Sequence, residues 1–391
     1  MAIVKPELLV WARKSIGLDV RVAAQKSGFP EDRISFWESG QDAPSIAQLR
    51  KLSEVYKRPL AVFFLSSPPQ GWDVMRDFRV MHGTESALWS PDLHAEFRRA
   101  NEQREAALEL LTLIGEEPTS AWRVSADEDE TLATLARERL LGSSPFPFPT
   151  SGNAYERLGF WVSALEELGV LVLTSNNVPV SEMRGFSIHE NPMPVVMVNG
   201  KDAVNGRIFS LLHEYAHLLL HSGGICDQRV LERPTDADRR LEARCNALAA
   251  SILMPKSAVL SHPLVAAKPL YHGEWPESEI RTLASYFGVS GEAVLRRLVT
   301  LERAPSTLYE IRREELLKLY AEYEKQRSDK SGGGGSYYRT HARNLGKAYV
   351  RLVMDAHAGR AIDSLTAASY LNAKVSSIAG LASAARATGE V

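Results

Sequence analysis

Cysteine is scarce in this chain: its 391 residues include two, Cys226 and Cys245. So few thiols exclude a disulfide-rich secreted scaffold and suit a reducing compartment. No run of about 18 apolar residues occurs, so the sequence predicts no membrane-spanning helix. The first residues also lack the apolar segment and cleavage site of a secretory signal peptide. We therefore expect a soluble, cytoplasmic protein without membrane contacts.

An excess of charge of one sign is also absent, because the net charge is −2. A content of 45% hydrophobic and 24% charged residues excludes a disordered or fibrous chain. The charge is distributed unevenly: residues 1–60 hold ten Lys and Arg against seven Asp and Glu, and residues 337–391 hold seven against three. The segment between them is therefore acidic. The two mildly basic ends allow contact with nucleic acid without requiring it.

The length favours two or three domains, and turn-forming residues suggest where they divide. The boundary signals are SSPPQG at 66–71, SPFPFPTSG at 144–152 and the flexible linker SGGGGS at 331–336. We predict an α+β protein that is mostly α. Its four regions are an all-α domain over 1–70, a helical connector over 71–150, an α+β domain over 151–305 and a C-terminal helical region over 306–391.

The α+β region is predicted from an alternation of patterns. The segment YERLGFWVSALEELG predicts a helix that ends at Gly169. Short apolar runs then predict strands at 170–175, 184–190 and 195–200. Two helices follow, and the second, LEARCNALAASILM, stops before Pro255. The order helix, strands, helix, helix is typical of a small α+β domain.

The first of these two helices contains FSLLHEYAHLLLHSGG at 209–224. His213 and His217 stand four apart, so on a helix both imidazoles face the same side, and Glu214 can reach a water between them. Zn²⁺ suits such ligands, keeps a position for water and lowers the pKa of that water from about 15.7 to about 7. The motif predicts a metal centre with Glu214 as general base. The alternative is a core helix with two hydrogen-bonded histidines.

A third ligand is needed, and the acidic residues after the motif supply two candidates. Glu242 stands at the start of the next predicted helix, 25 residues after His217, and is preferred. Glu232 is the alternative, although Pro234 follows it within a charged loop.

Other possible ligands are interpreted as structural. His221 lies roughly 12 Å along the helix axis from His213, too far to share an ion comfortably. The two cysteines are soft enough to bind zinc but are expected to be small core residues. Three further histidines offer possible oxyanion partners, and their spacing selects none of them: His189, His262 and His272.

Two segments resemble the ImmA/IrrE family of zincin-like metallopeptidases: RGFSIHENPMPVVMVNGKDAVNGRIFSLLHEYAHLLLHSGGIC and LEARCNALAASILMP. The resemblance is close over about 155–260. It implies that His213, His217 and Glu242 hold zinc and that Glu214 is the catalytic base. The segments WDVMRDFR and YYRTHARNLGKAYVR resemble the long branch of the family, which carries a helix-turn-helix.

The N-terminal region has the spacing of a helix-turn-helix. Ala24 is small enough for two helices to cross closely, Gly28 suits the turn, and Ile34 is apolar in the second helix. The stretch FWESGQDAPS resembles the end of a phage-repressor-like (Xre) domain, in which Trp37 would pack in the core. Residues 1–70 are therefore expected to form an Xre-type helix-turn-helix domain.

The second helix of this motif is expected to enter the major groove of DNA. Arg33 is suited to reading guanine, and the exposed basic residues before it are suited to phosphate. Glu31 and Asp32 oppose phosphate contact, so the alternative is a module for dimerisation or partner docking. The candidate DNA contacts are Arg21, Lys26, Arg33 and Ser35.

A second pattern of this kind occurs in SLTAASYLNAKVSSIAGL near the end of the chain. Ala368, Asn372 and Ile378 repeat the spacing of Ala24, Gly28 and Ile34. Asparagine replaces glycine at the turn, which makes the second signal the weaker one.

Two functional hypotheses follow. The resemblance implies a DNA-binding transcriptional regulator, with operator DNA as one partner, that carries a zinc-dependent endopeptidase for a partner regulatory protein. It also allows a homodimer. The alternative is a non-catalytic antitoxin or repressor of a toxin–antitoxin or mobile-element module, with the zincin fold as a protein-binding body. Glu214 between two intact histidines favours catalysis.

Overall fold

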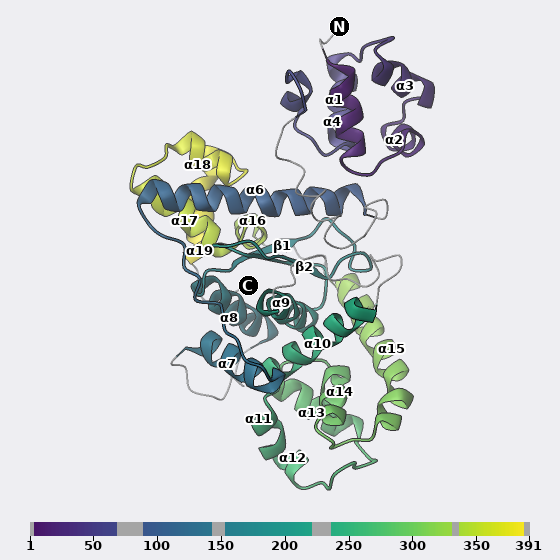
Figure 1. The fold of residues 1–391 in the computed structure, drawn as a ribbon, viewed down its shortest axis with the longest axis vertical. Helices are drawn as coiled ribbons and strands as arrows, with labels where there is room; N and C mark the ends of the chain where they lie inside the picture. Colours follow the sequence, from purple (N-terminus) through teal and green to yellow (C-terminus); the bar gives the residue numbers. More distant parts are fainter. Residues whose placement is uncertain (1–3, 69–88, 143–152, 221–235, 331–335, 387–391) are drawn as a thin grey trace. The chain divides into compact units, whose positions relative to one another are not determined.

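The computed structural model describes residues 4–68, 89–142, 153–220, 236–330 and 336–386 (Figure 1). The chain divides between residues 99 and 100 into two compact units, which we describe separately. The fold is mostly α with one small sheet, as the sequence predicted. Within the described residues no helix is long and apolar enough to cross a membrane.

The first unit begins with short helices: α1 (Pro6–Lys14), α2 (Val20–Ser27), α3 (Glu31–Ser39), α4 (Ile46–Val55) and the 3-10 helix η1 (Leu60–Phe64). Local chemistry sets several of their ends. The Asp19 side chain accepts a hydrogen bond from the Val22 N–H at 2.7 Å and caps α2. Ser45 and Gln48 form a capping box at the start of α4. The apolar faces of these helices enclose one small core around Trp37.

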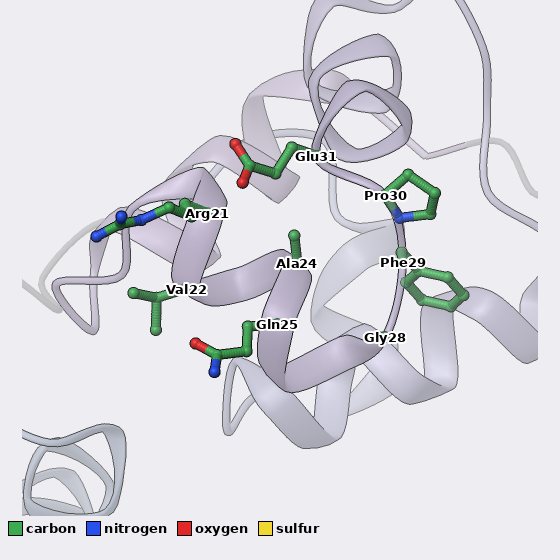
Figure 2. A pocket seen from close by; sticks show the side chains of 8 residues that line it. All are labelled: Arg21, Val22, Ala24, Gln25, Gly28, Phe29, Pro30 and Glu31. Atoms are coloured by element: carbon green, nitrogen blue, oxygen red, sulfur yellow. The ribbon is translucent and has the colours of Figure 1, made fainter.

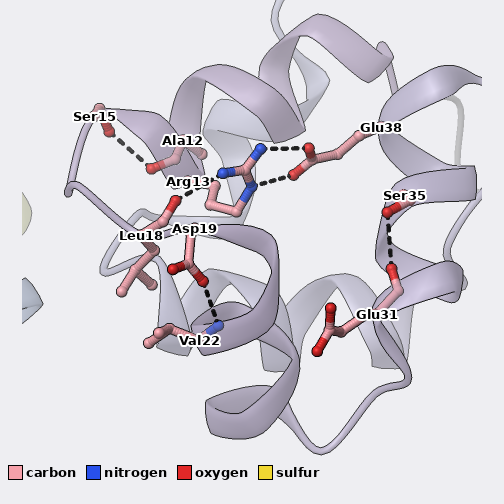
Figure 3. Close-up of polar contacts among 9 residues, drawn as sticks. All are labelled: Ala12, Arg13, Ser15, Leu18, Asp19, Val22, Glu31, Ser35 and Glu38. Carbon is pink, nitrogen blue, oxygen red and sulfur yellow. Dashed lines mark hydrogen bonds and ion pairs between the residues drawn. The ribbon is translucent and has the colours of Figure 1, made fainter.

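A buried ion pair joins α1 to α3 (Figure 3). The Arg13 guanidinium donates to both carboxylate oxygens of Glu38, each at 2.7 Å, and to the Leu18 carbonyl at 2.7 Å. The side chains of Arg13 and Glu38 are each 9% exposed. This bidentate contact fixes the first helix against the third.

The helices that follow are α6 (Pro91–Ile114), α7 (Asp129–Leu141), α8 (Ala154–Glu167), α9 (Val204–Leu219), α10 (Asp236–Leu253), α11 (Lys256–Ser261), α12 (Pro263–Ala266), α13 (Glu277–Phe287), α14 (Gly291–Thr300) and α15 (Ser306–Lys330). The C-terminal elements are α16 (Tyr337–Leu345), α17 (Lys347–Ala358), α18 (Ser364–Tyr370), the 3-10 helix η3 (Val375–Ser377) and α19 (Ile378–Arg386). The described part of the tail is therefore mostly helical, as expected.

The sheet has three strands, which confirm the predicted ones: β1 (Leu171–Ser175), β2 (Gly185–Ile188) and β3 (Val195–Asn199). Their order is β1-β3-β2, with β1 parallel and β2 antiparallel to β3. Every strand residue is buried, so both faces of the sheet are covered. Helix α9 contacts β2 and β3, whereas α8, α16 and α17 contact β1.

Helix α9 lies in the centre of the second unit. Of its 16 residues, 13 are buried, which explains why its sequence is apolar on nearly every side. It packs against α8, α10 and the sheet. The core around it includes Trp161, Leu211, Tyr215, Leu248 and Ile252.

The C-terminal helices are attached to the rest of the second unit through a buried acid. Glu166 of α8 accepts a hydrogen bond from the Ala348 N–H at 3.1 Å and from the Arg351 guanidinium at 3.2 Å. Burial raises the pKa of Glu166 to about 7, and these two donors only partly offset that effect.

Candidate metal centre and helix-turn-helix

Helices α9 and α10 bring three donor groups together. Nε2 of His213 and Nε2 of His217 lie 3.1 Å apart on successive turns of α9. Glu242, in the second turn of α10, places its Oε2 3.3 Å from Nε2 of His213 and its Oε1 3.3 Å from Nε2 of His217. Zinc bonds of about 2.0–2.2 Å at tetrahedral angles separate neighbouring ligand atoms by roughly 3.3–3.6 Å. The three donors therefore have nearly the spacing that one divalent cation requires.

The carboxylate of this group suits a cation. Burial alone would raise the pKa of Glu242, but hydrogen bonds from both imidazoles outweigh burial and lower it to about 2. Burial alone would lower the pKa of His213, but the hydrogen bond with Glu242 and the charges of Glu214 and Glu242 raise it. The carboxylate is therefore ionised at neutral pH, as a metal ligand must be.

Glu214 follows His213 on α9 and is 2% exposed. Its Oε2 has no hydrogen-bond partner among the described residues. Burial raises the pKa of Glu214, and the nearby charges of His213 and His217 offset this only in part. A buried carboxylate oxygen without a partner, next to two imidazoles, is poised to accept a proton from a water molecule.

Two neighbours of this group were not singled out from the sequence. A Cβ built on Gly185 of β2 would lie 3.1 Å from both Cγ and Oε1 of Glu214, so this glycine makes room for the acid. Asn246, four residues after Glu242 on α10, contributes a hydrogen bond that raises the pKa of His213. The glycine of the RGFS segment and the spacing of Glu242 and Asn246 were the available signals.

Among the described residues, His213, His217 and Glu242 are the group that could hold a metal ion. Cys245 lies in the core with a free thiol, and burial raises its pKa, so it is an unreactive packing residue as expected. Residues His221, Cys226 and Glu232 lie outside the described part of the chain, as do the WDVMRDFR segment, the SPFPFPTSG boundary and most of the glycine linker.

The three histidines that were possible oxyanion partners lie among other neighbours. His189 packs edge-on against Trp122. His262 caps α12 by accepting from the Leu264 N–H at 3.3 Å, and His272 packs against Trp275. These contacts select none of the three.

The N-terminal motif has the predicted geometry. Ala24 of α2 and Ile34 of α3 are 6% and 1% exposed, and Trp37 is 1% exposed in the same core. Gly28 ends α2 with φ of +67°, in the left-handed region that glycine adopts without strain. Its N–H donates to the Ala24 carbonyl at 2.7 Å. The α2–turn–α3 unit is a helix-turn-helix.

The candidate DNA contacts are exposed on this unit, but two of them have local partners. Arg33 lies 3.6 Å from the Asp42 carboxylate and over the Trp37 ring, and the Ser35 hydroxyl donates to the Glu31 carbonyl. Arg21 and Lys26 are exposed on α2. A groove runs along α2, the turn and the start of α3, and both Arg21 and Glu31 line it (Figure 2).

Comparison with known families gives two matches. Residues 9–63 match the family model described as helix-turn-helix, and residues 165–299 match the one described as IrrE N-terminal-like domain. No curated protein and no solved structure matches the chain. The second match includes α9 and α10 and so contains the three converging donors. The chain therefore joins an N-terminal Xre-type helix-turn-helix domain to a metallopeptidase-like domain of the ImmA/IrrE type.

Proposed function

We propose that this protein is a DNA-binding transcriptional regulator whose second unit is a zinc-dependent endopeptidase acting on a partner regulatory protein. The observation that carries the proposal is the convergence of His213, His217 and Glu242, with their ligand atoms 3.1–3.3 Å apart. The buried Glu214 beside them, with an oxygen that has no partner among the described residues, supports the catalytic role.

Each residue of the group has a distinct role in this proposal. His213 and His217 offer imidazole nitrogens, which lose their protons when the ion binds, and Glu242 offers an ionised carboxylate. When bound, Zn²⁺ supplies a Lewis acid that polarises a peptide carbonyl and acidifies water. Glu214 accepts the proton of the attacking water and delivers it to the leaving amine. Because the four side chains are nearly buried, water outside the site does not compete for these contacts.

The helix-turn-helix supplies the second half of the proposal. Helix α3 enters the major groove, where Arg33 reads a base and Ser35 hydrogen-bonds at the same surface. Arg21 and Lys26 bind phosphate from α2. Two chains would then read an operator with two half-sites, as dimeric proteins of this kind do, which makes a homodimer part of the proposal. Cleavage of a partner repressor, or control of a toxin, would couple peptidase activity to transcription.

The metal centre is tested by measuring bound zinc in purified protein. We expect about one ion per chain in the wild type and in Asp236→Asn, which removes an exposed carboxylate from the same helix. Glu242→Gln removes a direct ligand, and losing even an outer contact weakens metal binding by about 10–100-fold. The zinc affinity of Glu242→Gln should therefore fall by more than this factor. Equal zinc content in all three proteins would contradict the assigned ligands.

Catalysis is tested by incubating the protein with the product of the neighbouring gene. We expect the wild type to cleave it and Glu214→Gln, which keeps the metal ligands, to cleave it about 10²–10⁴-fold more slowly. A partner that stays intact with both proteins, or is cut equally by both, would contradict catalysis. Zinc bound without cleavage, together with a stable complex, would favour the non-catalytic antitoxin or repressor.

A further inference from the structure

The C-terminal helices follow the same order as those of the N-terminal helix-turn-helix. Helices α17, α18 and α19 follow one another as α1, α2 and α3 do, and the turn of η3 precedes α19 (Figure 1). The loop before α18 ends on Asp363, whose carboxylate accepts from the Thr366 N–H at 2.7 Å. Asp19 accepts from the Val22 N–H at the same distance before α2. The two second helices thus begin with the same cap.

The turn after the second helix is also repeated. Asn372 has φ of +45°, in the left-handed region that Gly28 occupies at +67°. Asparagine is one of the few residues with a side chain that enters this region readily. Asn372 therefore makes the turn for which a helix-turn-helix usually uses glycine.

The cores beneath the two turns correspond as well. Ala368 and Ile378 are 4% and 8% exposed, and they stand where Ala24 and Ile34 stand in the first motif. Three further buried pairs have the same separation along the chain: Leu18 and Ile362, Ala23 and Ala367, and Trp37 and Leu381. Cap, turn and core therefore agree, so the likeness extends beyond the spacing of three residues.

The two motifs differ in the charge of their outer surfaces. No Asp or Glu occurs from Ser364 to Arg386, whereas α3 begins with Glu31 and Asp32. Lys374, at the N-cap of η3, and Arg386, at the end of α19, are both exposed. Two acids adjoin this segment: Asp363 caps α18, and Glu109 of α6 accepts from the Tyr370 hydroxyl at 3.0 Å. The third-helix segment itself carries only basic charges, which attract the phosphate backbone, whereas two acids open α3.

The exposed side chains between these two cations are short. Val375, Ser376 and Ala379 face solvent at the start of the third-helix segment. Serine hydroxyls hydrogen-bond phosphates or base edges, and small apolar groups contact the methyl group of thymine. Short side chains also let the helix backbone approach the floor of the major groove.

We propose that residues 364–386 form a second helix-turn-helix that contacts double-stranded DNA, with η3 and the start of α19 lying in the major groove. The match in cap, turn and core, together with two exposed cations and no acid among residues 364–386, carries this inference. It depends neither on zinc nor on DNA binding by residues 9–63. A protein partner is the competing occupant of this surface, and the experiment below separates the two.

The test measures binding of the full-length chain to a fluorescent DNA duplex of random sequence at several salt concentrations. Lys374→Glu reverses one charge at an exposed position, so the fold should be kept. We expect roughly five- to tenfold weaker binding at low salt, and a slope of log affinity against log salt that falls by about one. Lys318→Glu, at an exposed position of α15, makes the same charge change elsewhere and should bind like the wild type.

A second arm locates the contact directly. After ultraviolet crosslinking of the full-length chain to the duplex, we expect crosslinked peptides from 364–386. Crosslinks confined to 20–39, or equal affinities for Lys374→Glu and Lys318→Glu, would overturn the proposal and favour a protein partner. Arg21→Glu reports on the N-terminal motif separately, so failure of either motif is distinguishable from failure of the other.

Discussion

A single glycine decides how the candidate catalytic acid is held. Gly185 of β2 faces Glu214 so closely that any Cβ would lie 3.1 Å from its Cγ and Oε1 and 3.0 Å from the Met197 carbonyl. Backbone atoms of a buried strand cannot yield, so the acid is the group that would have to move. The position of Glu214 therefore depends on the absence of a side chain on the neighbouring strand.

We predict that Gly185→Ala retains zinc but slows catalysis. The methyl group meets Glu214 at 3.1 Å, so the acid has to shift by a few tenths of an ångström. A displacement of about 1 Å at a reacting group costs about 10²-fold in rate, so we expect a smaller loss of roughly several-fold. Zinc content and cleavage rate are measured together. Gly273→Ala, at a glycine with open space around its Cβ position, is the control and should match the wild type. Full activity of Gly185→Ala would mean that Glu214 is not held in this way.

At the scale of elements, buried acidic side chains hold helices together in both units. Glu166 of α8 binds the start of α17, and Arg13 of α1 binds Glu38 of α3. The two contacts differ in the free energy that burying the charged groups costs. Arg13 and Glu38 neutralise each other through two parallel hydrogen bonds, whereas Glu166 is more deeply buried than its partner Arg351, whose side chain is 42% exposed.

We predict that Glu166 makes stability depend on pH. Its folded-state pKa of about 7 lies above its ordinary value of 4.5, so the folded chain holds a proton that the unfolded chain has lost. The contribution of Glu166 to the free energy of unfolding is present below about pH 4.5. It is lost as the pH rises to about 7, which lowers the free energy of unfolding by up to about 3 kcal/mol. Urea unfolding at pH 5 and pH 8 measures this. The fall should become smaller in Glu166→Gln and stay the same in Glu167→Gln, an exposed neighbour.

The ion pair of the first unit gives a prediction of a different kind. Arg13→Met leaves the Glu38 carboxylate buried without its partner and should destabilise the protein by roughly 3 kcal/mol. Replacing both residues, Arg13→Met with Glu38→Leu, should restore most of that loss, although the Leu18 carbonyl still loses its donor. Thermal unfolding of the single and double variants compares them. A double variant as unstable as the single one would show that the pair itself stabilises this unit.

At the scale of the whole molecule, the chain combines a recognition module with a candidate hydrolytic centre. The N-terminal module has a leading edge of mixed sign, because Arg21 and Glu31 line the same groove. Phosphate contact there is a balance between attraction and repulsion. Removal of the Arg21 charge should therefore lower the DNA affinity of this module, and removal of the Glu31 charge should raise it.

We predict that DNA binding by the full-length chain weakens as salt rises. Arg21→Glu should reduce the slope of log affinity against log salt by about one, whereas Glu31→Gln should strengthen binding. Fluorescence anisotropy with a labelled duplex measures both. A gel shift that persists unchanged after removal of residues 1–66 would place DNA binding outside this module.

Much of the fold and of the candidate site could be predicted from local sequence. The spacing of His213 and His217 requires only a helix, and the three strands follow from short apolar runs between turn residues. The first turn likewise follows from Gly28, since glycine adopts its backbone angles without strain. These features depend on residues close together in the chain, so a pattern within one segment is enough to predict them.

Only the tertiary structure decided how these segments meet. The approach of Glu242 to the histidines depends on the packing of α10 against α9, and the strand order β1-β3-β2 depends on pairing across intervening segments. The burial of Glu166 and the space at Gly185 likewise come from segments distant in the chain. The sequence by itself determined which chemical groups each element offers. Long-range packing determined which groups face one another, because such contacts follow from complementary shapes of whole elements and leave little trace in any one of them.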